Sequence, residues 1–308
     1  MRKMRSVIFR PSVALCAVAG VIGALVGSAP RLGAQVTALS AQNQHRKGQS
    51  VSPVYEGWYR GGDGLIRIVF GYQNRKTEER LDIPVGPNNK IEPGAADQGQ
   101  PTHFLTGRQY GVFTVTLPKE RATTEVVWTI ASNGATFSIP ANLDQLYLVE
   151  ALGTLYTKNE PPKLRFASDG APVVGPAGPT ISLSTTTAKP LSIDVWVSDD
   201  TIPPRRRQPA PNPNAPRDST PSANAPRAAA APESAGGLTV TWTKFRGPGK
   251  VDFSKASPPI EGGKATAVVS FDEPGDYALR VLASDGSSLS GQCCWTNGYV
   301  NVRVEAGK

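Results

Sequence analysis

Short segments that alternate apolar and polar residues are the feature that most restricts how this chain can fold. In Leu65–Asn74 the residues Ile66, Ile68 and Phe70 occupy every second position, and Tyr110–Pro118 alternates in the same way. Successive side chains of a strand point to opposite faces, so a period of two predicts strands with one buried face.

Turn residues separate these segments. Asn133 and Gly134 lie between two alternating runs, and an Asn-Gly pair is a common two-residue connection of a β-hairpin. Beyond the first 34 residues we expect at most one short helix, at Ala141–Leu152. Many short strands joined by Gly-, Pro- and Asn-rich turns predict an all-β chain of two immunoglobulin-like β-sandwich modules.

The N-terminus has the pattern of a secretory signal. A basic head is followed by Val13–Gly27, an uncharged run of 15 residues, and then by small residues up to Ala34. The run is shorter than the ~20 apolar residues that span a membrane. We therefore expect cleavage after Ala34 and a secreted or periplasmic protein without a membrane span. The alternative is an uncleaved segment that keeps the chain anchored.

The net charge of +8 comes mostly from this N-terminal segment. Residues 1–34 contain five of the 33 basic residues and none of the 25 acidic ones, so the rest of the chain carries only +3. Nucleic-acid binding needs Lys and Arg clustered on a folded surface, and the sequence contains no such cluster within its strands. We therefore expect no nucleic-acid partner.

Composition divides the chain into segments. We expect a signal at 1–34, a flexible lead-in at 35–52, a first sandwich at 53–160 and a second at 161–306. The second is interrupted by 201–237, which has nine prolines, nine alanines and no aromatic residue. Such a segment cannot bury enough apolar surface to offset its ordering entropy, so it is predicted to be disordered.

The second module resembles a PKD-like, immunoglobulin-type domain. The resemblance rests on Pro190–Asp200, Leu238–Phe253 and Ala265–Gly286, and the insert departs from it. It implies that Trp242 packs between two sheets and that Gly275-Asp-Tyr277 opens the penultimate strand. The family consists of structural and binding modules of exported proteins, so the resemblance implies a fold more than a function.

The first module is similar to an uncharacterised sandwich module of exported bacterial proteins, through Phe70–Asn74, Leu81–Gly94 and Asp97–Val115. Its long segment from Pro84 to Gly107 is rich in Gly, Pro and Asn, and loops of this length are often functional. The candidate binding residues there are Asn88, Asn89, Gln98, Gln100 and His103. The alternative is a packed loop that its own side chains hold together.

The sequence lacks the patterns of known catalytic centres, and we expect no enzyme and no cofactor. After the signal only His45 and His103 could act as a histidine base. Asp199, Asp200 and Asp285 could meet at one end of the second sandwich and bind calcium. The alternative is that each caps a turn by accepting a backbone hydrogen bond.

Cys293 and Cys294 are adjacent, and they are the only cysteines after the signal. Neighbouring Cα atoms across a trans peptide are ~3.8 Å apart, below the usual separation in a disulfide. A cross-link to another chain and a pair of unequal thiols therefore remain alternatives. We predict a strained vicinal disulfide, because an exposed thiol outside the cell tends to oxidise.

Of the five tryptophans, Trp128, Trp196 and Trp242 are expected in the core, and Trp58 and Trp295 at the surface. The sequence as a whole predicts an exported, non-catalytic binding or structural protein. Its partner would be a protein or a glycan at the cell envelope. The alternatives are a membrane-anchored accessory subunit of an envelope complex and a carbohydrate-binding protein.

Overall fold

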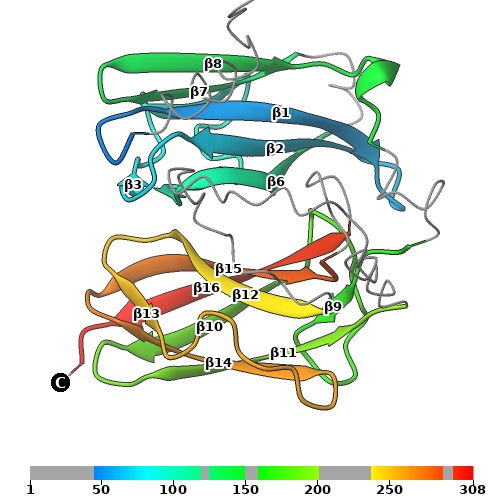
Figure 1. Cartoon of the computed structure of the whole chain (residues 1–308), viewed down its shortest axis with the longest axis vertical. Coiled ribbons are helices and arrows are strands. Elements are labelled where there is room, and N and C mark those ends of the chain that lie inside the picture. The colour runs from blue at the N-terminus through cyan, green and yellow to red at the C-terminus, as the bar shows by residue number, and fades with distance from the viewer. Residues whose placement is uncertain (1–44, 119–124, 150–158, 201–236, 287–293, 308) are drawn as a thin grey trace, which may run out of the picture. The chain divides into compact units, whose positions relative to one another are not determined.

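The computed structural model describes residues 45–118, 125–149, 159–200, 237–286 and 294–307. Residues 44–308 form one compact unit. Within the described ranges the chain is built almost entirely of strands, arranged as two sandwiches (Figure 1). No helix in the described part of the chain is long and apolar enough to cross a membrane.

The first sandwich contains two antiparallel three-stranded sheets and one short strand pair. One sheet has the order β1 (Val51–Arg60), β2 (Ile66–Asn74) and β6 (Gly107–Leu117), and the other has the order β4 (Asn89–Glu92), β7 (Val126–Ser132) and β8 (Ala135–Ala141). The pair consists of β3 (Leu81–Asp82) and β5 (His103–Phe104). Asn133 and Gly134 form the β7–β8 turn with φ of 50° and 76°, as the Asn-Gly pair predicts.

An aromatic cluster fills the space between these two sheets. Trp128 of β7 is fully buried, and its ring centroid lies 5.0 Å from that of Phe113 and 5.6 Å from that of Phe70. Both phenylalanines come from the opposite sheet, so the cluster ties the two sheets together. The edge-to-face geometry of these rings adds to the free energy gained from burying them.

The second sandwich consists of two four-stranded sheets (Figure 1). One has the order β10 (Thr180–Thr186), β16 (Trp295–Glu305), β15 (Gly275–Ser284) and β12 (Thr239–Arg246); the other has the order β13 (Val251–Phe253), β14 (Lys264–Phe271), β11 (Leu191–Ser198) and β9 (Lys163–Arg165). The sheet of β9, β11, β14 and β13 corresponds to the ABED sheet of an immunoglobulin fold. The sheet of β12, β15 and β16 corresponds to its CFG sheet, with β10 added beside β16. The second module is therefore immunoglobulin-like.

Two further features of the second module match this fold. Trp242 of β12 is 1% exposed and lies between the sheets. Tyr277 lies near the start of β15, and its hydroxyl donates to the carbonyl oxygen of Glu273 at 2.8 Å. A buried tryptophan on the third strand and a tyrosine bonded to the backbone upstream are both typical of immunoglobulin sandwiches.

The all-β fold with two sandwiches is confirmed, but the expected helix at Ala141–Leu152 is wrong. In its described part, β8 ends at Ala141 and only one 3₁₀ turn follows, η3 (Gln145–Tyr147). Part of the lead-in also packs on the first module, since Arg46 forms an ion pair with Glu78. The predicted signal and nearly all of the 201–237 insert lie outside the described residues.

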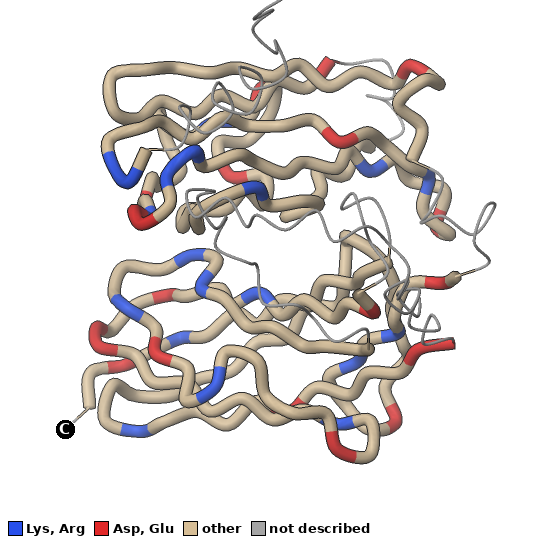
Figure 2. Tube along the Cα trace, in the orientation of Figure 1, with Lys and Arg blue, Asp and Glu red and all other residues tan. Residues whose placement is uncertain are grey.

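Charged residues of both signs are interspersed over both sandwiches (Figure 2). Several described ion pairs are exposed on both sides, such as Arg303 with Asp276 on β16 and β15. Exposed pairs of this kind contribute little to stability. The stability of the fold therefore depends mainly on the burial of apolar side chains and on the polar contacts between the two modules.

Candidate functional site

The sheet that contains β15 and β16 is covered on both faces. Its inner face lines the core of the second sandwich. On its other face, Phe245, Ala278 and Tyr299 belong to the same apolar cluster as the core of the first module. The rings of Phe245 and Tyr299 meet edge to face, with centroids 5.4 Å apart. The two modules therefore share a buried junction.

Arg280 lies at the centre of this junction and is only 5% exposed. Its Nε donates to Asn297 Oδ1 at 2.8 Å, and its Nη2 reaches the carbonyl oxygen of Tyr110 at 3.4 Å. Burial lowers the pKa of Arg280, while the nearby Tyr299, Tyr72 and Glu56 favour its charged form. A buried cation with so few direct partners makes this position sensitive to any change in packing.

Two polar side chains of β16 bond directly to the first module. Asn297 Nδ2 donates to the carbonyl oxygen of Gly111 at 2.8 Å, and the Tyr299 hydroxyl donates to that of Val112 at 2.9 Å. Gly111 has a φ of +47°, and the Trp295 ring fills the place where a Cβ would stand. These contacts fix β16 against the edge of β6.

Charged and backbone contacts close the rim of the junction. Both Nη atoms of Arg246 donate to the carboxylate of Asp97, at 2.7 and 2.8 Å. The hydrogen bonds from Arg246 hold the pKa of Asp97 below its ordinary value, despite partial burial. The Thr102 amide also donates to the carbonyl oxygen of Phe245 at 3.1 Å. Paired hydrogen bonds of this type fix orientation as well as distance.

A groove of about 710 Å³ opens beside this rim. Both modules line it, with Arg80, Asp82 and His103 from the first and Lys244, Lys250 and Glu273 from the second. Arg80 and Lys250 are exposed and form no ion pair with any other described residue. The groove thus offers charged groups of both signs to a ligand.

Asp82, His103 and Lys244 form the polar cluster of the groove. Asp82 Oδ1 lies 2.9 Å from His103 Nδ1 and 3.2 Å from Lys244 Nζ. Burial raises the pKa of Asp82, but the hydrogen bonds and charges of His103 and Lys244 outweigh it and hold the pKa below its ordinary value. Asp82 is therefore ionised at neutral pH and joins the two modules at this point.

A His–Asp pair activates a side-chain nucleophile only when a hydroxyl or thiol lies beside the imidazole. Across the described ranges, no hydroxyl or thiol is hydrogen-bonded to the His103 ring. The cluster presents a fixed imidazole and a fixed ammonium group at the groove wall.

The loop residues predicted to bind a ligand mostly hold the loop itself. Asn89 is fully buried, donates to the carbonyl oxygens of Ile83 and Pro101, and accepts from Trp128 Nε1. Gln98 and Gln100 likewise bond to backbone groups of their own loop. This geometry matches the packed-loop alternative at these three positions.

The other two candidate binding residues of the loop lie in different environments. Asn88 is exposed in the turn before β4, and its carbonyl oxygen accepts from the Ala131 amide. His103 lies on β5 and lines the groove. His103 is therefore the one predicted loop residue that the structure brings to the candidate site.

Three of the five tryptophans lie in environments that differ from those predicted. Trp295 is only 7% exposed, because it packs on Gly111. Trp58 is half-buried, and its Nε1 donates to the carbonyl oxygen of Asp144. Trp196, expected in the core, points away from it, since its neighbours Val195 and Val197 face inward; Lys264 lies over its ring. Trp295 therefore offers no open face for a sugar.

Asp199 and Asp285 do come close together, as the calcium hypothesis requires. Burial and then the charge of Asp285 raise the pKa of Asp199 to about 6. Asp200 also lies beside Asp199 and adds to this effect. Its carboxylate accepts from the Glu160 amide, and that of Asp285 accepts from Asn159. Among the residues that the structure describes, no three His, Cys, Asp or Glu side chains are grouped to hold a metal ion. We therefore do not assign calcium here.

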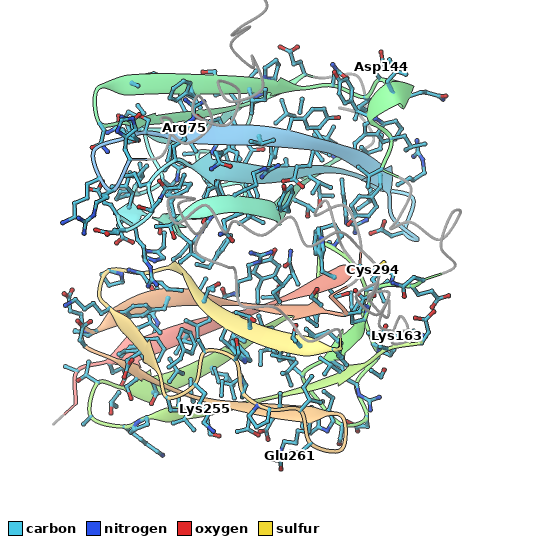
Figure 3. All side chains as sticks on the ribbon, in the orientation of Figure 1. Arg75, Asp144, Lys163, Lys255, Glu261 and Cys294 are labelled. Atoms are coloured by element: carbon cyan, nitrogen blue, oxygen red, sulfur yellow. The ribbon has the colours of Figure 1, made fainter. Side chains whose placement is uncertain are left out.

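Cys294 is 1% exposed and lies directly before Trp295 (Figure 3). Its Sγ lies 3.6 Å from the carbonyl oxygen of Asn159. Cys293 is outside the described residues, so the vicinal disulfide stays a prediction.

Comparison with known proteins gives no family. No family model matches the sequence, and a search of curated proteins finds no match. The PKD-like resemblance of the second module therefore stays a prediction.

Solved structures show only distant likeness. The D00–D0 domain of intimin is 12% identical over 82% of this chain and 98% of its own, with a TM-score of 0.23. The adhesin InvE of Yersinia pseudotuberculosis is 11% identical over 84% of this chain and 60% of its own, with a TM-score of 0.24. A protein of unknown function from Porphyromonas gingivalis W83 is 10% identical over 83% of this chain and all of its own, with a TM-score of 0.23. These scores are too low to support an argument, so the fold assignment depends on the strand order above.

Proposed function

We propose that this chain is an exported binding or structural protein of the cell envelope or extracellular space, and that the groove between its modules receives the partner. The observation that carries the proposal is the convergence of both modules on one groove whose walls are fixed by the Asp82, His103 and Lys244 contacts. Binding sites occur preferentially where two domains meet, because two rigid surfaces form a preorganised cleft there.

The chemistry of the groove favours a polar partner. Arg80 and Lys250 are exposed cations, whereas Glu273 supplies a negative charge on the second module. An extended protein segment or a glycan that carries acidic groups would pair with the two cations without opening the buried junction. The N-terminal segment, with its basic head and apolar run, supports export.

Site-specific photo-crosslinking in the native envelope tests this proposal. We expect a photoreactive residue in place of Lys250 to yield a discrete covalent adduct with an envelope component. The matched control is the same residue in place of Val268, which is 38% exposed on β14 and does not line the groove. Adducts at both positions, or at neither, contradict the proposal.

A further inference from the structure

The outer strand β10 has an open edge whose hydrogen-bonding groups can be assigned. It pairs with β16 in parallel and without a register shift. At the two ends of the ladder, the Tyr299 amide donates to the carbonyl oxygen of Pro179, and the Thr187 amide donates to that of Glu305. Because residues of a parallel ladder bond alternately to either side, Ile181, Leu183 and Thr185 bond to β16.

The intervening residues therefore direct their backbone groups away from the sheet. Thr180, Ser182 and Ser184 each turn an amide and a carbonyl toward the open edge, and their side chains are exposed as well. Within the described part of the chain, the backbone amides and carbonyls of Ser182 and Ser184 form no hydrogen bond. A row of unpaired amide and carbonyl groups is a template for a further strand.

Edge strands usually carry features that prevent such pairing, and the other described edges of the second sandwich do so. β9 has Lys163 and Arg165, β13 has Asp252, and the Trp242 amide of β12 is already bonded to the carbonyl oxygen of Ala256. β10 instead reads Thr-Ile-Ser-Leu-Ser-Thr-Thr, with no charge, no proline and no bulge. Charge, proline and bulges are the means by which proteins block edge pairing.

The same strand is complementary to itself. In an antiparallel pair centred on Ser182, Thr180 faces Ser184 of the second strand, and all three outward residues form hydrogen-bonded pairs. Ile181 then faces Leu183, and both are half-buried residues that pack against the core of their own sandwich. Two uncharged copies bring no like charges together, and each extends the apolar strip of the other.

We propose that β10 pairs with β10 of a second copy of this chain, antiparallel, with a two-fold axis at Ser182. The two sheets then form one continuous sheet across the dimer. A two-fold contact of this kind is closed, so it yields dimers and not filaments. Because each chain contributes only the short segment 180–184, the dimer is expected to dissociate on dilution.

Disulfide trapping in the full chain tests the predicted register. Hydrogen-bonded residues of an antiparallel pair have Cα atoms about 5.5 Å apart, which suits a disulfide. Under mild oxidation Ser182→Cys should give a covalent dimer whose linked peptide joins position 182 to position 182. Ser184→Cys is the matched control, because its two copies would be about 13 Å apart along the strands. We expect at least tenfold less dimer from it.

A second variant tests the role of the Ser182 amide in solution. Ser182→Pro removes an outward N–H and none of the hydrogen bonds to β16, whereas Ser182→Ala keeps the N–H. Sedimentation equilibrium should show at least tenfold weaker dimerisation for the proline variant and no change for alanine, with circular dichroism confirming that both fold. Equal trapping at 182 and 184, or a wild-type chain that stays monomeric at every concentration, overturns the proposal.

Discussion

Replacing Arg280 by alanine is expected to destabilise the protein by about 3 kcal/mol. The substitution removes the donors to Asn297 Oδ1 and to the Tyr110 carbonyl oxygen and leaves a cavity at the junction. A buried acceptor that loses its donor retains its full desolvation penalty, and removing one member of a buried charged network is strongly destabilising. Urea unfolding, followed by tryptophan fluorescence, measures the loss.

Arg303→Ala is the matched control for this variant. Arg303 lies on β16, but it is exposed, and its ion pair within the described part of the chain is with the exposed Asp276. Exposed ion pairs contribute about 0–1 kcal/mol. Equal stabilities of the Arg280 and Arg303 variants would show that the junction contributes little to folding.

Gly111→Ala is expected to cost about 3 kcal/mol or more, because two separate effects combine. Gly111 has a φ of +47°, which residues other than glycine rarely adopt, and a Cβ there would lie 1.9 Å from Trp295 Cη2. Trp295 is buried, so its ring cannot move aside without opening the junction. The melting temperature of the variant, measured by circular dichroism, should fall by several degrees.

Gly64→Ala separates the backbone effect from the steric one. Gly64 also has a positive φ, +77°, but no atom lies within 4 Å of its Cβ position. It should therefore lose only the conformational term, about 1 kcal/mol. A loss at Gly111 no larger than that at Gly64 would contradict the packing of Trp295 on this glycine.

The strands and their buried faces could be predicted from sequence, because a strand's period of two depends on neighbouring residues alone. Phe113, Val115 and Leu117 are buried on β6, and Val300, Val302 and Val304 on β16, as the alternation indicates. The helix at Ala141–Leu152 was wrong in its described part, because the carbonyl oxygens of Asn142 and Asp144 accept from side chains of β1 and not from the amides four residues on, as in an α-helix.

The junction could not be predicted, although a signal for it is present. On β15, Ala278, Arg280 and Leu282 share the face opposite the core, so the middle of this strand, from 277 to 283, is apolar on both faces apart from one arginine. Such a strand indicates a covered sheet. The cover itself, the edge of β6, lies about 170 residues away in sequence, and local patterns contain no information on contacts at that separation.

Only one residue of the polar cluster in the groove could be predicted from the sequence, for the same reason. His103 was a candidate because it lies in a long loop, whereas Asp82 and Lys244 were not. The strands that bring Asp82 and His103 together contain two residues each, too few to show any period. Lys244 reaches Asp82 from the other module, and no spacing rule relates the two positions.

Scanning calorimetry of the wild-type chain tests most directly whether the two sandwiches fold as one cooperative unit through their buried junction. A single transition whose calorimetric enthalpy equals its van't Hoff enthalpy is the predicted result, because neither module can unfold without exposing Arg280 and the shared apolar cluster. Two resolved transitions, or a calorimetric enthalpy about twice the van't Hoff value, would contradict it.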